Sequence, residues 1–371
     1  LGPDRHLTLV PIPRPKRGPL PRAMKPETLR ILDASLNRAS EGLRVVEDYA
    51  RFVLGDAHLT GVAKGLRHRL AETAKAVPAA DRHAMRETQQ DVGATITTET
   101  ETQRGAAWHV CAASLKRVEQ SLRSLEEFGK LGDGAFASGC ESLRYRTYTL
   151  EKALDTTRIS RERLDAARLC VLVGGLPSGD AFVALANELV EAGVGMIQLR
   201  DKKLEGRDLA ARARVLVAAT RGTGSLAIIN DRPDIAAAAG ADGVHLGQTD
   251  LSVHDARSIV GPRAIIGVST HSIDQTRRAV LDGANYLGAG PTFPSKTKSF
   301  DDFPGLDYLR QVSAEVSLPT FAIGGVHEDN LPEVLETGAS RIAVSEAVSV
   351  ADKPAAAAAR LLEQLATAAA T

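Results

Sequence analysis

Eight short runs of β-branched and aliphatic residues recur in the second half of the chain, and each ends at a polar or Gly-rich turn. The runs begin at Cys170, Met196, Leu226, Gly243, Ala264, Tyr286, Thr320 and Arg341. The stretches between them have helical spacing, as in residues 181–193 and 209–220. Strand, crossover helix and strand in repetition predict a parallel α/β fold. We expect a TIM (β/α)8 barrel over residues 161–371, with a doubly wound open sheet as the alternative.

The residues before the predicted barrel are helical in pattern and contain an internal repeat. Residues 38–51 resemble residues 117–130, and the shorter segment 65–70 resembles 142–147. A long helix and its partner helix therefore both recur. This predicts an all-α helical-bundle domain with pseudo-twofold symmetry over residues 24–160.

Two features of this helical domain allow both a structural and a functional interpretation. Arg123 and Glu126 stand three residues apart on one helix, where an ordinary ion pair is the structural interpretation. The polar stretch 86–101 is too long for a simple helix connection, so it is either a solvated linker or a loop that organises a ligand. No Gly-rich phosphate motif of the Walker type occurs in this half of the sequence.

Composition indicates a two-domain cytoplasmic enzyme. The chain has 371 residues with 43% hydrophobic content, which suffices for two cores. Lys plus Arg equals Asp plus Glu at 46 each, which argues against nucleic-acid and anionic-membrane partners and leaves small molecules as the expected ligands. The three cysteines lack metal-like spacing and suit a reducing cytoplasm. Residues 1–23 are rich in Pro and Arg and are expected to be a disordered extension, while homo-oligomerisation is left open.

Polar and cationic residues follow the predicted strands at their carboxyl ends, where α/β barrels bind ligands. Gln198 and Arg200 are two residues apart on one strand, so their side chains point the same way, and Lys202 follows in the loop. An amide, a guanidinium and an ammonium group together suit a polar ring that carries a polyanionic phosphate. An ordinary strand end is the structural alternative.

Two carboxylates follow adjacent strands. Asn230 and Asp231 end the third predicted strand, and Asp250 lies in the loop after the fourth. Carboxylates beside several cations are best explained by Mg²⁺, which prefers a few carboxylates plus phosphate oxygens and water. The alternative is that both aspartates are loop caps. His245 lies within the fourth strand, is interpreted as a satisfied histidine of the barrel wall, and is assigned no role.

Hydroxyl groups and glycines complete the predicted anion-binding set. Ser269, after the fifth strand, can donate to a phosphate oxygen. A loop suited to close over an anion and exclude water follows the sixth strand and carries Ser295, Thr297 and Lys298. We expect a second phosphate to bind backbone amides at the ends of the last two strands, at Gly325, Val344 and Ser345.

Residues 165–365 resemble the thiamine-phosphate synthase family. The segments that carry the resemblance are QLRDK, ND followed by GVHLGQTD, GVS, GPTFPSKTK, AIGG and a final VS, in that order. The resemblance implies that 4-amino-2-methyl-5-hydroxymethylpyrimidine diphosphate reacts with a thiazole phosphate to give thiamine phosphate and pyrophosphate. It also implies a dissociative mechanism, in which pyrophosphate leaves first and the thiazole nitrogen captures a pyrimidine-stabilised cation. No side-chain nucleophile is needed for that route.

The same resemblance implies roles for the candidate residues. The pyrimidine diphosphate would be held by Gln198, Arg200, Lys202, Asn230, Ser269 and Lys298, and Mg²⁺ would be held by Asp231 and Asp250. The thiazole phosphate would be bound by Ser295, Thr297, Gly325, Val344 and Ser345. The catalytic candidates are Arg200, Ser269 and Lys298. Many relatives have Thr where this chain has Ser295, and we expect no loss of activity because both residues offer a hydroxyl.

Two alternatives remain from the sequence. Similar barrels act as thiazole tautomerases or as regulatory, non-synthase phosphate binders, which are expected to lack the full metal and diphosphate set. The helical domain resembles one found in front of thiamine-phosphate synthases in some bacteria, through NRASEGLRVVED, DVG and LRYRTYTLEK. That resemblance implies a hydroxymethylpyrimidine phosphate kinase, which would make the diphosphate substrate. The alternative for this domain is an oligomerisation or substrate-delivery module.

Overall fold

The computed structural model describes residues 24–87, 104–294 and 304–370. The chain divides into two compact units, one of residues up to Val46 with Ala63–Tyr148 and the other of Glu47–Val62 with Thr149 onward. The predicted domain boundary after residue 160 stays a prediction. The predicted extension 1–23, most of the polar stretch 86–101, and the predicted site residues Ser295, Thr297 and Lys298 lie outside the described residues.

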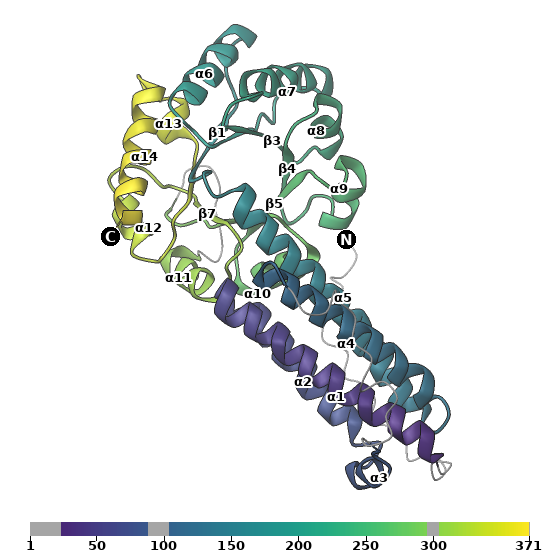
Figure 1. Ribbon diagram of the computed structural model, residues 1–371. Helices are drawn as coiled ribbons and strands as arrows, with labels where there is room; N and C mark the ends of the chain where they lie inside the picture. Colours follow the sequence, from purple (N-terminus) through teal and green to yellow (C-terminus); the bar gives the residue numbers. More distant parts are fainter. Residues whose placement is uncertain (1–23, 88–103, 295–303, 371) are drawn as a thin grey trace. The chain divides into compact units, whose positions relative to one another are not determined.

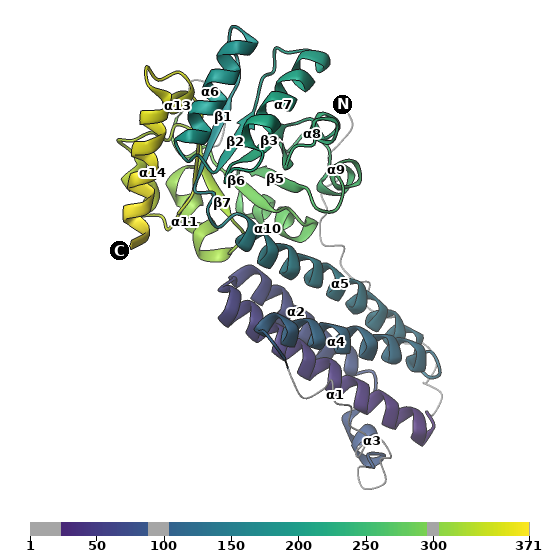
Figure 2. The same cartoon turned by 45° about the horizontal axis from the view of Figure 1, so that its top comes forward.

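The helical unit is built from long helices that lie side by side (Figures 1 and 2). Its helices are α3 (Ala79–Ala84), α4 (Ala107–Gly129) and parts of α1 (Pro26–Asp48), α2 (Ala57–Ala74) and α5 (Gly134–Arg163), each of which also contributes residues to the second unit. After α1 comes a π-helical turn, Tyr49–Leu54, which belongs to the second unit. Both members of each sequence repeat are helical, as predicted.

The two long repeat helices bury equivalent positions. Buried apolar residues recur every three or four positions, which places them on one face of each helix. On α1 these are Leu32, Leu36, Ala39, Leu43 and Val46. On α4 they are Cys111, Leu115, Val118, Leu122 and Leu125. The internal repeat therefore encodes two copies of the same packing stripe.

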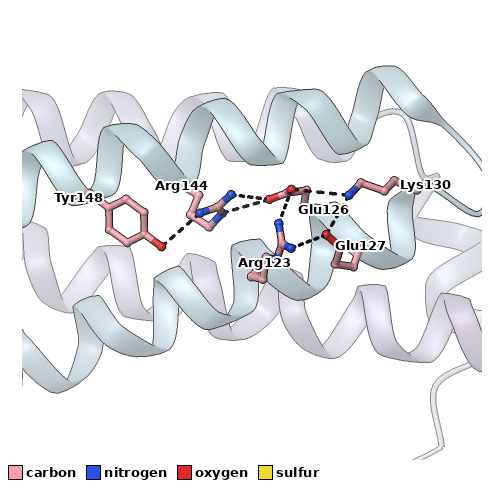
Figure 3. Close-up of polar contacts among 6 residues, drawn as sticks. All are labelled: Arg123, Glu126, Glu127, Lys130, Arg144 and Tyr148. Carbon is pink, nitrogen blue, oxygen red and sulfur yellow. Dashed lines mark hydrogen bonds and ion pairs between the residues drawn. The ribbon is translucent and has the colours of Figure 1, made fainter.

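A buried carboxylate organises one side of the helical unit (Figure 3). Glu126 of α4 is only 3% exposed and accepts from the Arg144 guanidinium of α5 at 2.9 and 3.0 Å. Arg123 approaches the other carboxylate oxygen at 2.6 Å, which confirms the predicted ion pair. Arg144 also donates to the Tyr148 hydroxyl at 3.3 Å. These bonds join α4 to α5 through one charged cluster.

The second unit contains a closed barrel of eight parallel strands in the order β1 to β8. The strands are β1 (Leu169–Val173), β2 (Met196–Leu199), β3 (Leu226–Asn230), β4 (Gly243–Leu246), β5 (Ile265–Thr270), β6 (Tyr286–Ala289), β7 (Thr320–Ile323) and β8 (Ile342–Val344). Each overlaps the run predicted for it, and closure of the sheet rules out the open-sheet alternative. The TIM-barrel prediction is therefore confirmed.

Helices surround the strands in an outer ring (Figure 1). They are α6 (Gly179–Glu191), α7 (Gly206–Thr220), α8 (Pro233–Ala239), α9 (Val253–Val260), α10 (Ile273–Asp282), α11 (Gly305–Glu315), α12 (Leu331–Leu335), α13 (Glu346–Ser349) and α14 (Pro354–Ala370). The strands are buried on both faces, which explains why they read as continuous apolar runs. None of the helices in the described part of the chain is long and apolar enough to cross a membrane.

The short segment 47–62 packs with the barrel through a fully buried carboxylate. Asp56 is 0% exposed and accepts from the Leu59 amide at 2.7 Å at the start of α2. Its other oxygen accepts from the Ser317 amide at 2.8 Å and from the Ser317 hydroxyl at 3.1 Å, in the loop before β7. One aspartate thus caps a helix and fixes the loop that leads into a barrel strand.

Candidate active site

A cavity of about 550 Å³ opens at the carboxyl ends of the barrel strands. It brings together candidates from five different strand ends, those of β2, β3, β5, β7 and β8. The candidates that line it are Gln198, Arg200, Asn230, Ser269, Gly325, Val344 and Ser345. The cavity volume suits a small-molecule ligand of the size that barrel enzymes bind.

One wall of the cavity carries a pair of hydrogen-bonded amides. Gln198 at the end of β2 is 3% exposed, and its Nε2 donates to Oδ1 of Asn230 at 3.1 Å. Strands β2 and β3 are neighbours, so the bond fixes the two amides relative to each other. Arg200 follows Gln198 by two residues and lines the same cavity, as the strand alternation predicted.

The acidic pair lies beside the cavity rather than in its lining. Among the described candidates, Lys202, Asp231 and Asp250 do not line the cavity itself. Lys202 Nζ lies 3.6 Å from Asp231 Oδ2, and the Gly247 amide donates to Asp250 Oδ2 at 2.6 Å. The Asp231 amide donates to the His245 carbonyl at 2.8 Å, with the Asp231 backbone at a left-handed φ of 61°. This backbone turn aims the carboxylate towards Asp250.

The charges around Asp231 favour a cation between the two aspartates. Burial raises the pKa of Asp231, and the adjacent Asp250 raises it further, while Lys202 and Arg200 offset part of the effect. Two carboxylates held together therefore repel, and a divalent cation would relieve that repulsion. No group of three or more His, Cys, Asp or Glu side chains suited to a metal occurs within the described residues. The pair fits an ion that takes its remaining ligands from substrate phosphate and water, as Mg²⁺ does.

Another part of the cavity lining is the turn after β7, which contains two glycines. Gly324 and Gly325 have φ values of 97° and 69°, which favour glycine. A Cβ on Gly324 would also lie 2.7 Å from the Cβ of Pro291, so the β7 turn packs directly on the loop after β6. Asn330 Nδ2 holds the turn by donating to the Gly325 carbonyl at 2.9 Å. Val344, the last residue of β8, and Ser345, which follows it, line the same cavity, so the structure brings together the three residues expected to bind the second phosphate.

Three histidines that the sequence analysis gave no role line the cavity, namely His245, His271 and His327. His245 lies in the barrel wall with both ring nitrogens bonded, to the Tyr286 hydroxyl at 3.0 Å and to Ser269 Oγ at 2.8 Å. It is thus the satisfied wall histidine that was predicted, but it also contacts a candidate catalytic residue. The sequence signal for His245 was its place near the carboxyl end of the fourth predicted strand, and the structure adds that it pairs with Asn230 in the sheet register.

Comparisons with known proteins agree with this site. The thiamine monophosphate synthase family model matches residues 169–348, and the ThiD2 family model matches residues 30–153. A thiamine-phosphate synthase of Rhodopirellula baltica is 45% identical over 87% of this chain and 89% of its own length. One from Synechocystis sp. is 39% identical over 91% of this chain and 96% of its own length.

A solved structure shows the same likeness for the barrel. The thiamine phosphate pyrophosphorylase from Pyrococcus furiosus superposes with a TM-score of 0.50 and 34% identity, covering 56% of this chain and 98% of that protein. Since its relatives match over most of their own length, the chain belongs to the thiamine-phosphate synthase family, enzymes that transfer the pyrimidinylmethyl group.

Proposed function

We propose that the barrel joins hydroxymethylpyrimidine diphosphate to thiazole phosphate, giving thiamine phosphate and pyrophosphate. The observation that carries the proposal is the lining of the cavity. One part of the lining holds the Gln198–Asn230 amide pair with Arg200 and the acidic pair nearby, and another contains the glycine turn after β7. A cationic, amide-bearing lining suits a pyrimidine with a diphosphate, and the backbone of a glycine turn suits a single phosphate.

The proposed mechanism assigns each described side chain a positioning or charge-stabilising part. The amides of Gln198 and Asn230 orient the pyrimidine ring, and Arg200 holds the diphosphate as the carbon–oxygen bond breaks. Ser269 donates a hydrogen bond to an oxygen of the leaving pyrophosphate. The backbone at Gly325, Val344 and Ser345 holds the thiazole phosphate. The thiazole nitrogen is thereby placed to attack the pyrimidine cation that remains once pyrophosphate has left.

We propose Mg²⁺ as the cofactor, held by Asp231 and Asp250. When bound there, it would neutralise charge that develops on the departing pyrophosphate. Lys202 lies 3.6 Å from Asp231 and would add a second positive charge on the same side. The proposed roles of Ser295, Thr297 and Lys298 rest on the sequence alone, because these residues lie outside the described part of the chain.

The direct test is thiamine phosphate formation by the purified chain with Mg²⁺, thiazole phosphate and the pyrimidine diphosphate. Arg200→Met should lower kcat/KM by about 10²-fold, the cost of losing one electrostatic donor at a transition state. Arg310→Met is a matched control, since Arg310 lies on α11 and is half exposed beside Asp307. The same change there should leave turnover unaltered. If the wild-type chain binds thiazole phosphate but forms no product, a regulatory or tautomerase barrel is favoured instead.

A second activity is proposed for the helical unit, a hydroxymethylpyrimidine phosphate kinase. The supporting observation is the ThiD2 family match over residues 30–153. The assay repeats thiamine phosphate formation with pyrimidine monophosphate and ATP in place of the diphosphate. Product would support a bifunctional chain, provided that Arg200→Met consumes ATP at the wild-type rate while it forms thiamine phosphate about 10²-fold more slowly. With no ATP consumption by an active synthase, a substrate-delivery or oligomerisation module is favoured.

We also propose a cytoplasmic location, supported by three free, buried cysteines in the described residues.

A further inference from the structure

Three inward positions of the barrel share one layer of the sheet. His245 of β4 pairs in register with Gly267 of β5, and Gly267 pairs with Tyr286 of β6. The central position therefore carries no side chain. As a result, the rings of Tyr286 and His245 meet across β5, with centroids 5.4 Å apart.

Glycine at position 267 is required for this contact. A Cβ added there would lie 2.0 Å from Cζ of Tyr286, inside the ring. A second glycine, Gly288, leaves room for the imidazole, since a Cβ there would lie 3.1 Å from Cε1 of His245. Two residues without side chains thus open a buried path from Tyr286 through His245 to Ser269.

The direction of the hydrogen bonds along this path follows from burial. Tyr286 is 2% exposed, and its hydroxyl has one hydrogen-bond partner among the described residues, the Nδ1 atom of His245. If Tyr286 accepted that bond, its own proton would be buried without an acceptor, which is unfavourable. Tyr286 therefore donates to Nδ1, and the imidazole carries its proton on Nε2.

The hydroxyl of Ser269 is oriented by the second bond. Nε2 lies 2.8 Å from Ser269 Oγ and donates to it. Ser269 then accepts from His245, and its own proton points elsewhere. Ser269 lines the cavity, so the cavity ligand is the available acceptor.

We propose that Tyr286 and His245 are positioning residues that hold Ser269 as a hydrogen-bond donor to the departing pyrophosphate. The proposal rests on the synthase function proposed above and extends it to a residue that does not line the cavity, Tyr286. Without the buried tyrosine, the imidazole can place its proton on Nδ1, and Ser269 can turn to donate into Nε2. The serine then no longer donates to substrate.

The environment of His245 agrees with a neutral ring. Burial lowers the pKa of His245 to about 4, with nearby Arg200 lowering it and Asp250 partly offsetting this. Burial also raises the pKa of Tyr286, so that its hydroxyl keeps its proton. Both groups therefore remain hydrogen-bonding partners rather than acids or bases at neutral pH.

The test is a double-mutant cycle on the full chain, with kcat and KM measured separately. Ser269→Ala should lower kcat by about 10²-fold, as expected for loss of one donor to a developing charge. Tyr286→Phe should lower kcat by about 10-fold with little change in KM, since it removes one oxygen atom that lies away from the substrate. Tyr286→Phe in the Ser269→Ala background should have no further effect, because the tyrosine acts only through the serine.

Tyr308→Phe is the matched control. Tyr308 is equally buried in the barrel unit, but its hydroxyl bonds Thr276 on α10 at 2.7 Å. Its loss should leave kcat unchanged. If Tyr286→Phe does not fold, His245→Gln replaces it in the cycle. The glutamine amide can still donate to Ser269, so it should retain more activity than His245→Leu.

Two outcomes would overturn the proposal while the wild-type chain makes thiamine phosphate. One is wild-type kcat in Tyr286→Phe. The other is a double variant whose loss is the product of the two single losses, about 10³-fold, which would mean that Tyr286 acts independently of Ser269. A wild-type chain that makes no product would instead refute the synthase function itself, so the two failures are distinguishable.

Discussion

Asp231→Asn separates the charge of the acidic pair from its backbone geometry. Asp231 has a left-handed φ of 61°, a conformation that asparagine also tolerates, so the turn should persist in the variant. Only the negative charge next to Asp250 is removed. The variant therefore asks whether that charge binds Mg²⁺ or serves the fold.

The expected effect on stability has a definite sign. Burial and Asp250 raise the pKa of Asp231 in the folded protein, so the metal-free folded state binds protons more readily than the unfolded state. The contribution of Asp231 to stability is therefore fully present below its unfolded pKa and is lost as pH rises through its folded pKa. At pH 7 the metal-free wild type carries the repulsion between the Asp231 and Asp250 carboxylates, and the variant does not.

The magnitudes follow from the local geometry. Like charges 4 Å apart near a protein surface repel by up to about 4 kcal/mol. The Asp231 side chain is 30% exposed and has Lys202 at 3.6 Å, which reduces the effect. We expect the metal-free variant to gain roughly 1 kcal/mol over the metal-free wild type. Saturating Mg²⁺ at about 100 Kd should stabilise only the wild type, by about 2.7 kcal/mol or ~5–10 °C in Tm.

The assay is thermal unfolding with EDTA, with Mg²⁺, and with Mg²⁺ plus pyrophosphate, alongside turnover. Turnover of the variant should fall about 10²-fold. Asp307→Asn is the control, because Asp307 is 87% exposed on α11 and should behave as wild type in every condition. A variant that keeps the Mg²⁺-dependent rise in Tm would falsify the assignment of Asp231 to the metal. A wild type without any such rise would refute the site as a whole.

Two further predictions concern the buried groups of the helical unit and the thiols. Arg144→Met should destabilise the helical unit by about 3 kcal/mol in urea unfolding, because the buried Glu126 carboxylate loses its buried cationic partner. Arg123→Met should cost less than about 1 kcal/mol, because the Arg123 side chain is 55% exposed. Equal losses in the two variants would contradict this argument. Burial raises the pKa of Cys140 and Cys170 to about 12. Iodoacetamide at pH 8 should therefore alkylate neither thiol in the native chain, while both should react in urea. Alkylation of either cysteine in the native protein, detected by mass spectrometry, would contradict their burial.

The local pattern of the sequence was enough to predict the elements and the order of the site. Each strand is a short apolar run that ends at a polar turn, and such runs report burial on both faces. Parallel strands in alternation with helices place their carboxyl ends together, so Gln198, Asn230 and Ser269 could be expected in one cavity before the structure was known. The repeat likewise predicted that α1 and α4 would bury matching stripes.

Cross-strand register was decided only by the tertiary structure. The contact between His245 and Tyr286 depends on Gly267 lying between them in the sheet, and strand patterns do not reveal which residues of β4, β5 and β6 stand opposite each other. For the same reason, His245 looked like an ordinary wall residue in the sequence. The sequence also showed no sign of the left-handed turn at Asp231, where φ is 61°. That turn is held by a hydrogen bond from the Asp231 amide to the His245 carbonyl on the next strand. Periodicity records how each segment is buried, whereas register and turn geometry arise from contacts between segments that are distant in sequence.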